Sequence, residues 1–160
     1  MKNKYDAVMS RIGYEYIRGP HPVTADDLTR FETELGFQLP TDYRTFLMKY
    51  GFSSGDVRLQ LPDDDEGDGT SIDVFYGLGP DDAYDIRERR KTFADRLPKY
   101  LLPFVSGSGG EFCLCLSGDN YGRVYWWFQE MGTVESEDEL EPITESFDEF
   151  MNSLVREEDE

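Results

Sequence analysis

Two short runs of this sequence concentrate carboxylates, which can bind a cation, transfer a proton or contact a basic partner. The first run consists of Asp63, Asp64, Asp65, Glu66 and Asp68. The second consists of Glu135, Glu137, Asp138 and Glu139. Which of the three roles these residues play depends on the other chemistry in the chain and on the elements that hold them.

The first run does not complete a calcium-binding EF-hand loop. When Gly69 is placed at the invariant glycine of that loop, the closing bidentate Glu is replaced by Phe75. Predicted strands, rather than helices, also flank the run. Loose cation binding, a solvated loop and a contact surface for a basic partner remain open, and we predict no dedicated metal site.

Other chemistry-bearing residues are sparse. His21 is the single histidine and lies between two prolines, with no evident nucleophile or orienting partner. Cys113 and Cys115 are the only cysteines, and on one strand they would lie about 7 Å apart, too far for a disulfide. No further zinc ligands accompany them. We expect buried, reduced thiols and no cofactor.

Two weaker patterns also fall short of an active site. Gly107–Gly110 lacks the third spaced glycine of a phosphate-binding loop and precedes a predicted strand. Asp81 and Asp82 could form an acid–base pair, but such pairs arise by chance in a chain with 34 acidic residues. We predict that the protein is not an enzyme, and a deep pocket with converging polar groups would revive that alternative.

The charge balance points to a protein partner. The chain has 16 basic and 34 acidic residues, a formal net charge of −18, which argues against a direct nucleic-acid role. A basic protein is the favoured partner, although acidity also simply keeps a protein soluble. The sole basic cluster, Arg87 to Lys91, is expected to pair with surplus carboxylates. Without a signal peptide or a bilayer-length apolar run, we expect a cytoplasmic protein that makes no membrane contact.

The pattern of apolar residues predicts one α+β domain. Helical spacing predicts four amphipathic helices, over residues 5–12, 24–35, 40–50 and 146–155, and acidic residues open a further helical segment over 81–93. Alternating or apolar runs predict strands over 57–61, 71–77, 101–105, 111–116 and 123–129. We expect an antiparallel-rich central sheet packed by about four helices, with the domain over 1–155 and an acidic tail over 156–160.

Local signals specify several of these helix ends. Thr24 can cap the second helix and Gly36 can stop it. Thr41 can cap the third helix, and Gly51 can end it in the left-handed conformation. Ser146–Glu149 has the spacing of a capping box for the last helix.

The two C-terminal strand predictions carry more specific expectations. Residues 111–116 are apolar on both faces, which indicates a central strand covered on both sides. In the next strand, Tyr125 and Trp127 point one way, and Trp126 and Phe128 the other. Core packing is the favoured role for these rings, and an exposed pair would instead offer interface anchors.

Four segments, in this order, resemble the SUKH superfamily. They are LPTDYRTFLMKYGFSSG at 39–55, YLLPFVSGSGGEFCLCL at 100–116, GRVYWWFQE at 122–130 and ESFDEFMNSL at 145–154. The chain departs from the family's usual Asn-Gly-Gly at residues 52–55 and from its usual Asp-His-Glu at residues 128–130. The resemblance, which covers most of residues 24–155, implies an α+β domain that binds and neutralises a toxin domain, commonly a nuclease or deaminase, without a cofactor. The superfamily also includes the yeast cell-wall-assembly regulators.

The combined expectation is an immunity-type protein that binds a basic toxin domain. The expected contacts are the two carboxylate runs, which would occupy the electrostatic field that phosphates feel. The alternative is a non-toxin adaptor or regulatory module of the same fold, which would bind through its aromatic face and depend little on ionic strength.

Overall fold

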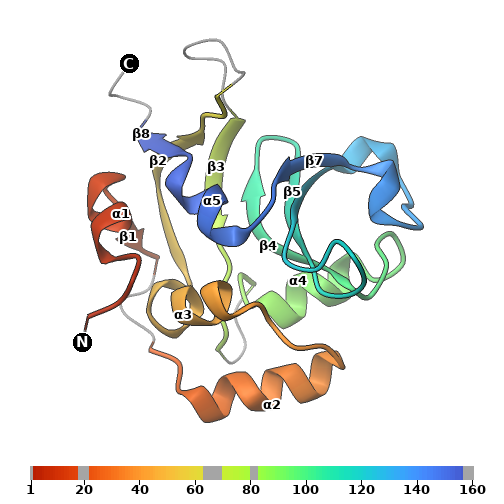
Figure 1. Ribbon diagram of the computed structural model, residues 1–160, viewed down its shortest axis with the longest axis horizontal. Coiled ribbons are helices and arrows are strands. Elements are labelled where there is room, and N and C mark those ends of the chain that lie inside the picture. The colour runs from red at the N-terminus through yellow and green to blue at the C-terminus, as the bar shows by residue number, and fades with distance from the viewer. Residues whose placement is uncertain (1, 18–21, 63–69, 80–82, 157–160) are drawn as a thin grey trace.

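The centre of the protein is an antiparallel β-sheet (Figure 1), seen in a computed structural model that describes residues 2–17, 22–62, 70–79 and 83–156. Within these ranges the sheet has eight strands: seven follow one another in the order of the chain, and the eighth returns to pair with the second. The strands are β1 (Glu15–Tyr16), β2 (Ser53–Leu59), β3 (Thr70–Phe75), β4 (Leu101–Gly107), β5 (Gly110–Cys115), β6 (Val124–Phe128), β7 (Glu141–Thr144) and β8 (Leu154–Arg156).

Short helices lie on both faces of this sheet. They are α1 (Asp6–Arg11), α2 (Ala25–Leu35), α3 (Thr41–Tyr50), α4 (Ile86–Thr92) and α5 (Phe147–Asn152), with 3₁₀ turns η1 (Gln129–Met131) and η2 (Glu137–Glu139) between β6 and β7. The predicted α+β class and the antiparallel-rich sheet are confirmed.

The larger part of the core lies under α3 and α5. The rings of Phe46, Tyr43 and Phe104 all pack around the ring of Phe147, with centroid separations of 5.1 to 5.5 Å. Edge-on packing of this kind stabilises aromatic clusters beyond the area that they bury. The apolar stripes predicted for residues 40–50 and 146–155 therefore meet each other over the sheet.

A second, smaller core lies on the opposite face, under α4. Cys113, Tyr125 and Trp127 point to this side, and Phe93 packs edge-on against Trp127 at 5.0 Å. All six residues of β5 are buried, which confirms the prediction of a central strand covered on both sides. Cys113 and Cys115 are buried, free thiols, and burial raises the pKa of both.

The predicted start and stop of α2 are confirmed. Thr24 forms a capping box with Asp27, and Gly36 adopts the left-handed conformation at φ 80°. The predicted cap of α5 is confirmed in part: the Ser146 hydroxyl accepts a hydrogen bond from the Glu149 N–H, while the Glu149 carboxylate accepts from the Glu145 N–H instead of from Ser146.

The predicted position of the α3 end is confirmed, but the predicted left-handed conformation of Gly51 is wrong. Gly51 is extended, at φ −63°, and the left-handed residue is Phe52, at φ 61°. Gly51 is required for a different reason, because a Cβ there would lie 2.7 Å from the Cα of Gly77. The start also differs: Pro40, rather than Thr41, occupies the N-cap position, without a side-chain cap.

Three other predicted boundaries are wrong. The strands predicted over 101–105 and 111–116 both extend into the segment between them, because β4 and β5 pair as far as Gly107 and Gly110. The helix predicted over 81–93 begins only at Ile86, because Asp85 caps it by accepting from the Arg87 N–H. The last helix ends at Asn152, because the following residues leave it to form β8 beside β2.

Candidate partner-binding surface

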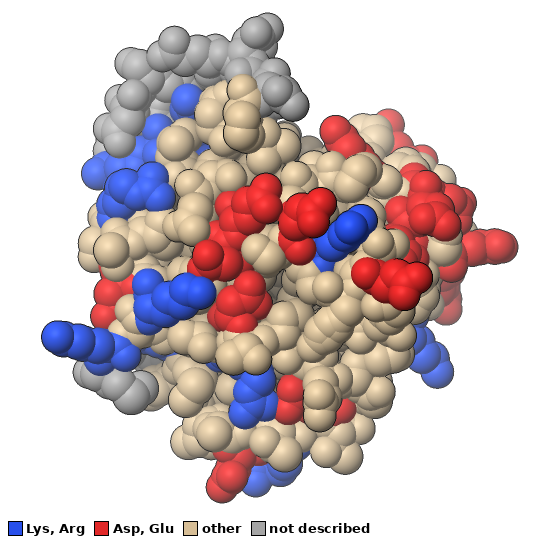
Figure 2. All heavy atoms as spheres, viewed as in Figure 1, with Lys and Arg blue, Asp and Glu red and all other residues tan. Residues whose placement is uncertain are grey.

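The second carboxylate run lies on the segment that joins β6 to β7. Val134 and Leu140 are buried in the core under α4, and the residues between them form the surface turn η2. Figure 2 shows acidic side chains gathered at this edge of the molecule, and a second group over α5. We call Glu135, Asp138, Glu139 and Glu141, all exposed, the acidic edge.

Hydrogen bonds within η2 hold the acidic edge in one conformation. The Glu139 carboxylate accepts from the backbone N–H groups of Glu135, at 2.7 Å, and Ser136, at 3.1 Å. The Ser136 hydroxyl in turn accepts from the Asp138 N–H at 3.3 Å. Because Glu139 is occupied in fixing the turn, Glu135 and Asp138 are the carboxylates that the turn presents to solvent.

Glu137 belongs to the same predicted run but has a different role. Its carboxylate accepts from the Tyr100 hydroxyl at 2.6 Å and from the Asn120 amide at 3.0 Å. These hydrogen bonds lower the pKa of Glu137, while burial and the bond to Glu137 raise the pKa of Tyr100 to about 12. Glu137 therefore joins η2 to β4 and to the turn before β6.

The acidic edge lies in a long stretch without cations. Residues 124–155 contain nine Asp and Glu residues and no Lys, Arg or His. Within the described ranges, none of the four acidic-edge residues forms an ion pair. The charge of this edge is therefore not neutralised by the protein itself.

The acidic group at the junction of α1, α3 and α5 differs in this respect. Asp148 pairs with Lys4 at 2.8 Å, and Asp6 pairs with Lys49 at 2.8 Å. Their hydrogen-bonded partners lower the pKa of both carboxylates. Asp42 accepts from the Asp148 N–H at 3.0 Å, so these carboxylates mainly join helices to one another.

Two apolar side chains lie exposed directly before the acidic edge. Phe128 is 41% exposed and Met131 is 48% exposed. The predicted alternation of β6 is confirmed: Tyr125 and Trp127 face the core under α4, whereas Trp126 is half-buried against Phe112 on the other face. Exposed aromatic and Met side chains next to charged ones are typical of protein interfaces.

The first carboxylate run, Asp63, Asp64, Asp65, Glu66 and Asp68, lies outside the described residues. The same holds for His21, Asp81 and Asp82. Among the residues that are described, no group of three His, Cys, Asp or Glu side chains could hold a metal ion. In that same part of the chain, no helix has the length and apolar character that crossing a bilayer demands.

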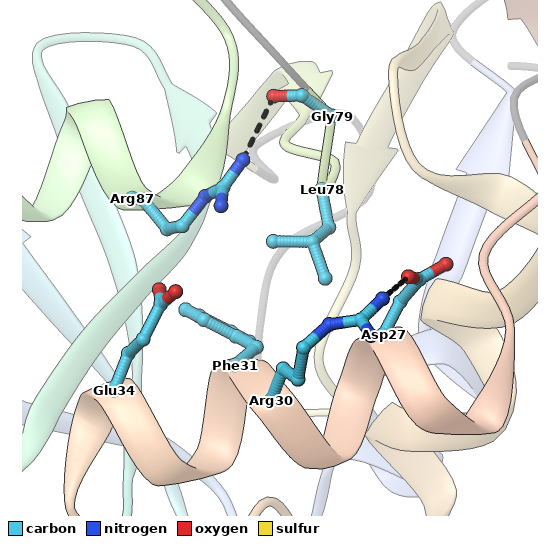
Figure 3. Close-up of a pocket in the computed structure, with 7 residues that line it drawn as sticks. All are labelled: Asp27, Arg30, Phe31, Glu34, Leu78, Gly79 and Arg87. Carbon is cyan, nitrogen blue, oxygen red and sulfur yellow. Dashed lines mark hydrogen bonds and ion pairs between the residues drawn. The ribbon is translucent and has the colours of Figure 1, made fainter.

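A polar groove between α2 and the start of α4 is the best candidate for enzymatic chemistry (Figure 3). It has a volume of about 220 Å³, with Phe31 and Leu78 at its base. Its charged side chains bond to neighbouring groups: Arg30 to Asp27, and Arg87 to Asp85 and to the Gly79 carbonyl. Among the described residues that line the groove there is no Ser, Thr, Cys or His side chain.

Glu111 is a buried carboxylate that the sequence analysis did not single out. Glu111 is 2% exposed on the α4 face of β5, and the Tyr76 hydroxyl donates a hydrogen bond to it. Arg89 of α4 lies over the rings of Tyr76 and Phe93, at 5.4 and 5.0 Å. Burial raises the pKa of Glu111 to about 7. A single acidic residue in the otherwise apolar run GEFCLC was the signal that could have identified it.

Comparison with known proteins covers nearly the whole of this architecture. The model of the SMI1 / KNR4 family (SUKH-1) matches residues 22–153, which run from before α2 to the end of α5 and include the acidic edge. The SPbeta prophage-derived uncharacterized protein YokK of Bacillus subtilis (strain 168) is 31% identical over 156 residues, covering 88% of this chain and 79% of that protein.

Proposed function

The chain belongs to the SMI1 / KNR4 family (SUKH-1), and from this we propose that it is an immunity protein that binds and neutralises a basic toxin domain of the nuclease or deaminase class. Members of this family are typically immunity-like proteins, so a protein partner follows from the family. The class of toxin, the cytoplasmic location and the surface that binds are parts of the proposal.

The observation that supports this proposal most directly is the unneutralised charge of the acidic edge. A nuclease or deaminase binds a polyanion, so the surface around its active site is positively charged. Carboxylates on a rigid turn can occupy that field and exclude the substrate. Opposite fields also accelerate association and disfavour other partners.

The predicted contact residues would have two different roles. Glu135 and Asp138 point outward and would meet the cations of the toxin. Glu139 and Glu137 would act indirectly, by holding the turn. The run from Asp63 to Asp68 remains a proposed second contact region.

The test is a measurement of association kinetics against a basic C-terminal toxin domain, to be sought first in the neighbouring reading frame. The triple variant Glu135→Lys, Asp138→Lys, Glu141→Lys should associate about tenfold or more slowly, because it reverses the field at the contact. The association rate of the unchanged protein should fall as salt is added.

A matched control separates local from global charge. Glu15→Lys, Asp26→Lys, Glu34→Lys makes the same change in net charge at exposed positions on β1 and α2, away from η2. This control should associate and neutralise nearly as the unchanged protein does. Equal loss in both triple variants would refute a localised acidic contact.

The exposed Phe128 and Met131 favour a second candidate function, a non-toxin adaptor that binds through apolar contacts. Its binding would be insensitive to salt and to the lysine substitutions. It would be lost in Phe128→Ser, Met131→Ser.

A further inference from the structure

An apolar slot lies between α4, the turn that follows it and β4. It has a volume of about 130 Å³. Its lining includes the apolar residues Phe93, Ala94, Leu97, Pro98, Leu101 and Pro103. A cavity of about this size admits a benzene-sized group, so the slot can take one Leu, Met or Phe side chain.

Three cations surround the slot: Arg90, Lys91 and Lys99. They belong to the segment 87–99, which holds six basic residues and two acidic ones in a chain whose net charge is −18. A strongly basic segment of the chain therefore borders an apolar depression.

Five cations outside this segment form ion pairs with carboxylates. The ion pairs outside this segment are Lys4–Asp148, Arg30–Asp27, Arg44–Glu32, Lys49–Asp6 and Arg123–Glu145. The cations around the slot have fewer such ion pairs. Neither Arg90 nor Lys99 has an ion pair among the described residues, and Lys91 has a single exposed contact with Glu88 at 3.4 Å.

Arg90 carries an additional sign of an unfilled site. Its Nε atom is buried and has no hydrogen-bond partner in the part of the chain that the structure describes. A buried donor without a partner costs free energy, and a carboxylate arriving at the slot would satisfy it.

We propose that this slot docks an acidic protein segment that inserts one bulky apolar side chain between α4 and β4. The apolar side chain fills the cavity, and flanking carboxylates meet Arg90, Lys91 and Lys99. This site is independent of the proposed toxin contact, since it selects a partner of the opposite charge.

The partner binds through its side chain rather than by adding a strand to the sheet. Pro103 in the β4 wall has no N–H to donate to a partner backbone. A nucleic acid fits less well, because the slot admits one apolar side chain rather than a series of stacked bases.

The test is an NMR titration of the full ¹⁵N-labelled chain with short synthetic peptides. The main probe is an acidic peptide with a central Phe, and the same peptide with Ser in that place is the first comparison. The Phe peptide should shift the amide signals of Ala94, Leu97 and Leu101 and bind about tenfold or more tightly than the Ser peptide, because it buries an aromatic ring.

Two protein variants separate the slot from general charge. Lys91→Glu, Lys99→Glu should abolish binding of the Phe peptide, and Ala94→Trp, which blocks the slot from an exposed position, should do so without changing net charge. The control Lys2→Glu, Arg30→Glu makes the same charge change elsewhere and should bind normally.

The proposal is overturned if the Phe and Ser peptides bind equally, if the shifts fall outside the slot, or if no peptide binds. It is also overturned if a short oligothymidylate binds the slot more tightly than the acidic peptide. None of these outcomes depends on the toxin-neutralisation assay, so the two proposals can fail separately.

Discussion

Replacing Glu111 by Gln tests how a buried carboxylate makes the stability of this protein depend on pH. Burial under α4 raises the pKa of Glu111 from 4.5 to about 7. The positive charge of Arg89 and hydrogen bonds from Tyr76 and Gln129 oppose this rise, and the negative charge of Asp73 adds to it. The folded state therefore holds a proton that the unfolded chain has already lost at neutral pH.

The sign follows from the higher pKa in the folded state. The contribution of Glu111 to stability is full below about pH 4.5 and is lost as the pH rises through about 7. The difference between the two pKa values corresponds to about 3 kcal/mol above pH 7, of which about 2.5 kcal/mol is lost between about pH 5 and about pH 8. Gln has no charge to bury and keeps an oxygen that can accept a hydrogen bond from Tyr76. The free energy of unfolding of Glu111→Gln should therefore not show this loss as the pH rises.

The assay is urea denaturation at about pH 5 and at about pH 8. It compares the unchanged protein with Glu111→Gln, and Glu135→Gln is the exposed control. Stability of the variant relative to the unchanged protein should increase by about 2.5 kcal/mol from the lower to the higher pH. The control should show no such increase. Identical pH dependence in all three proteins would refute the argument.

Three further predictions can be checked by the same denaturation measurements. Gly77→Ala should lower the free energy of unfolding by about 2 to 4 kcal/mol, because the added Cβ would lie 2.4 Å from the Phe52 ring. This loss should shrink in a Phe52→Gly background. An equal loss in both backgrounds would exclude the clash. Thr24→Ala should lower the free energy of unfolding by about 1 kcal/mol by removing the cap of α2, whereas Thr24→Ser should be nearly neutral. Similar effects of the two substitutions would contradict the capping argument. Phe147→Ala should cost about 3 to 5 kcal/mol and Phe147→Leu clearly less, and a loss below about 1 kcal/mol in the first would mean that this ring is not central to the core.

Periodic elements of this fold were predictable because local spacing alone determines which face of a helix or strand is apolar. Helix ends were predictable where neighbouring residues decide them, as at Thr24. They were not predictable where a distant segment decides them: Gly51 is extended because Gly77 lies against it, and the last helix ends early because β2 recruits the residues after it.

The candidate surface shows the same limit. Sequence analysis located the run from Glu135 to Glu139, but it could not separate its members. Glu137 is taken up by Tyr100 and Asn120, both remote in the chain, while Glu135 and Asp138 remain exposed. The slot beside α4 forms because β4 lies next to the turn after α4. No local sequence pattern predicts that these two segments lie side by side.

The return of β8 to β2 has a consequence for how the protein is made. Residues 57–59 must wait for Leu154–Arg156, which are held at α1 by the Arg11 guanidinium donating to the Leu154 carbonyl at 2.7 Å. On the ribosome, β2 and its neighbour β3 emerge long before β8, so one edge of β2 stays open to other nascent chains until β8 follows. The sheet is therefore completed only after β8 has left the ribosome, and a rate measured for that step would set the earliest moment at which a newly made copy can function.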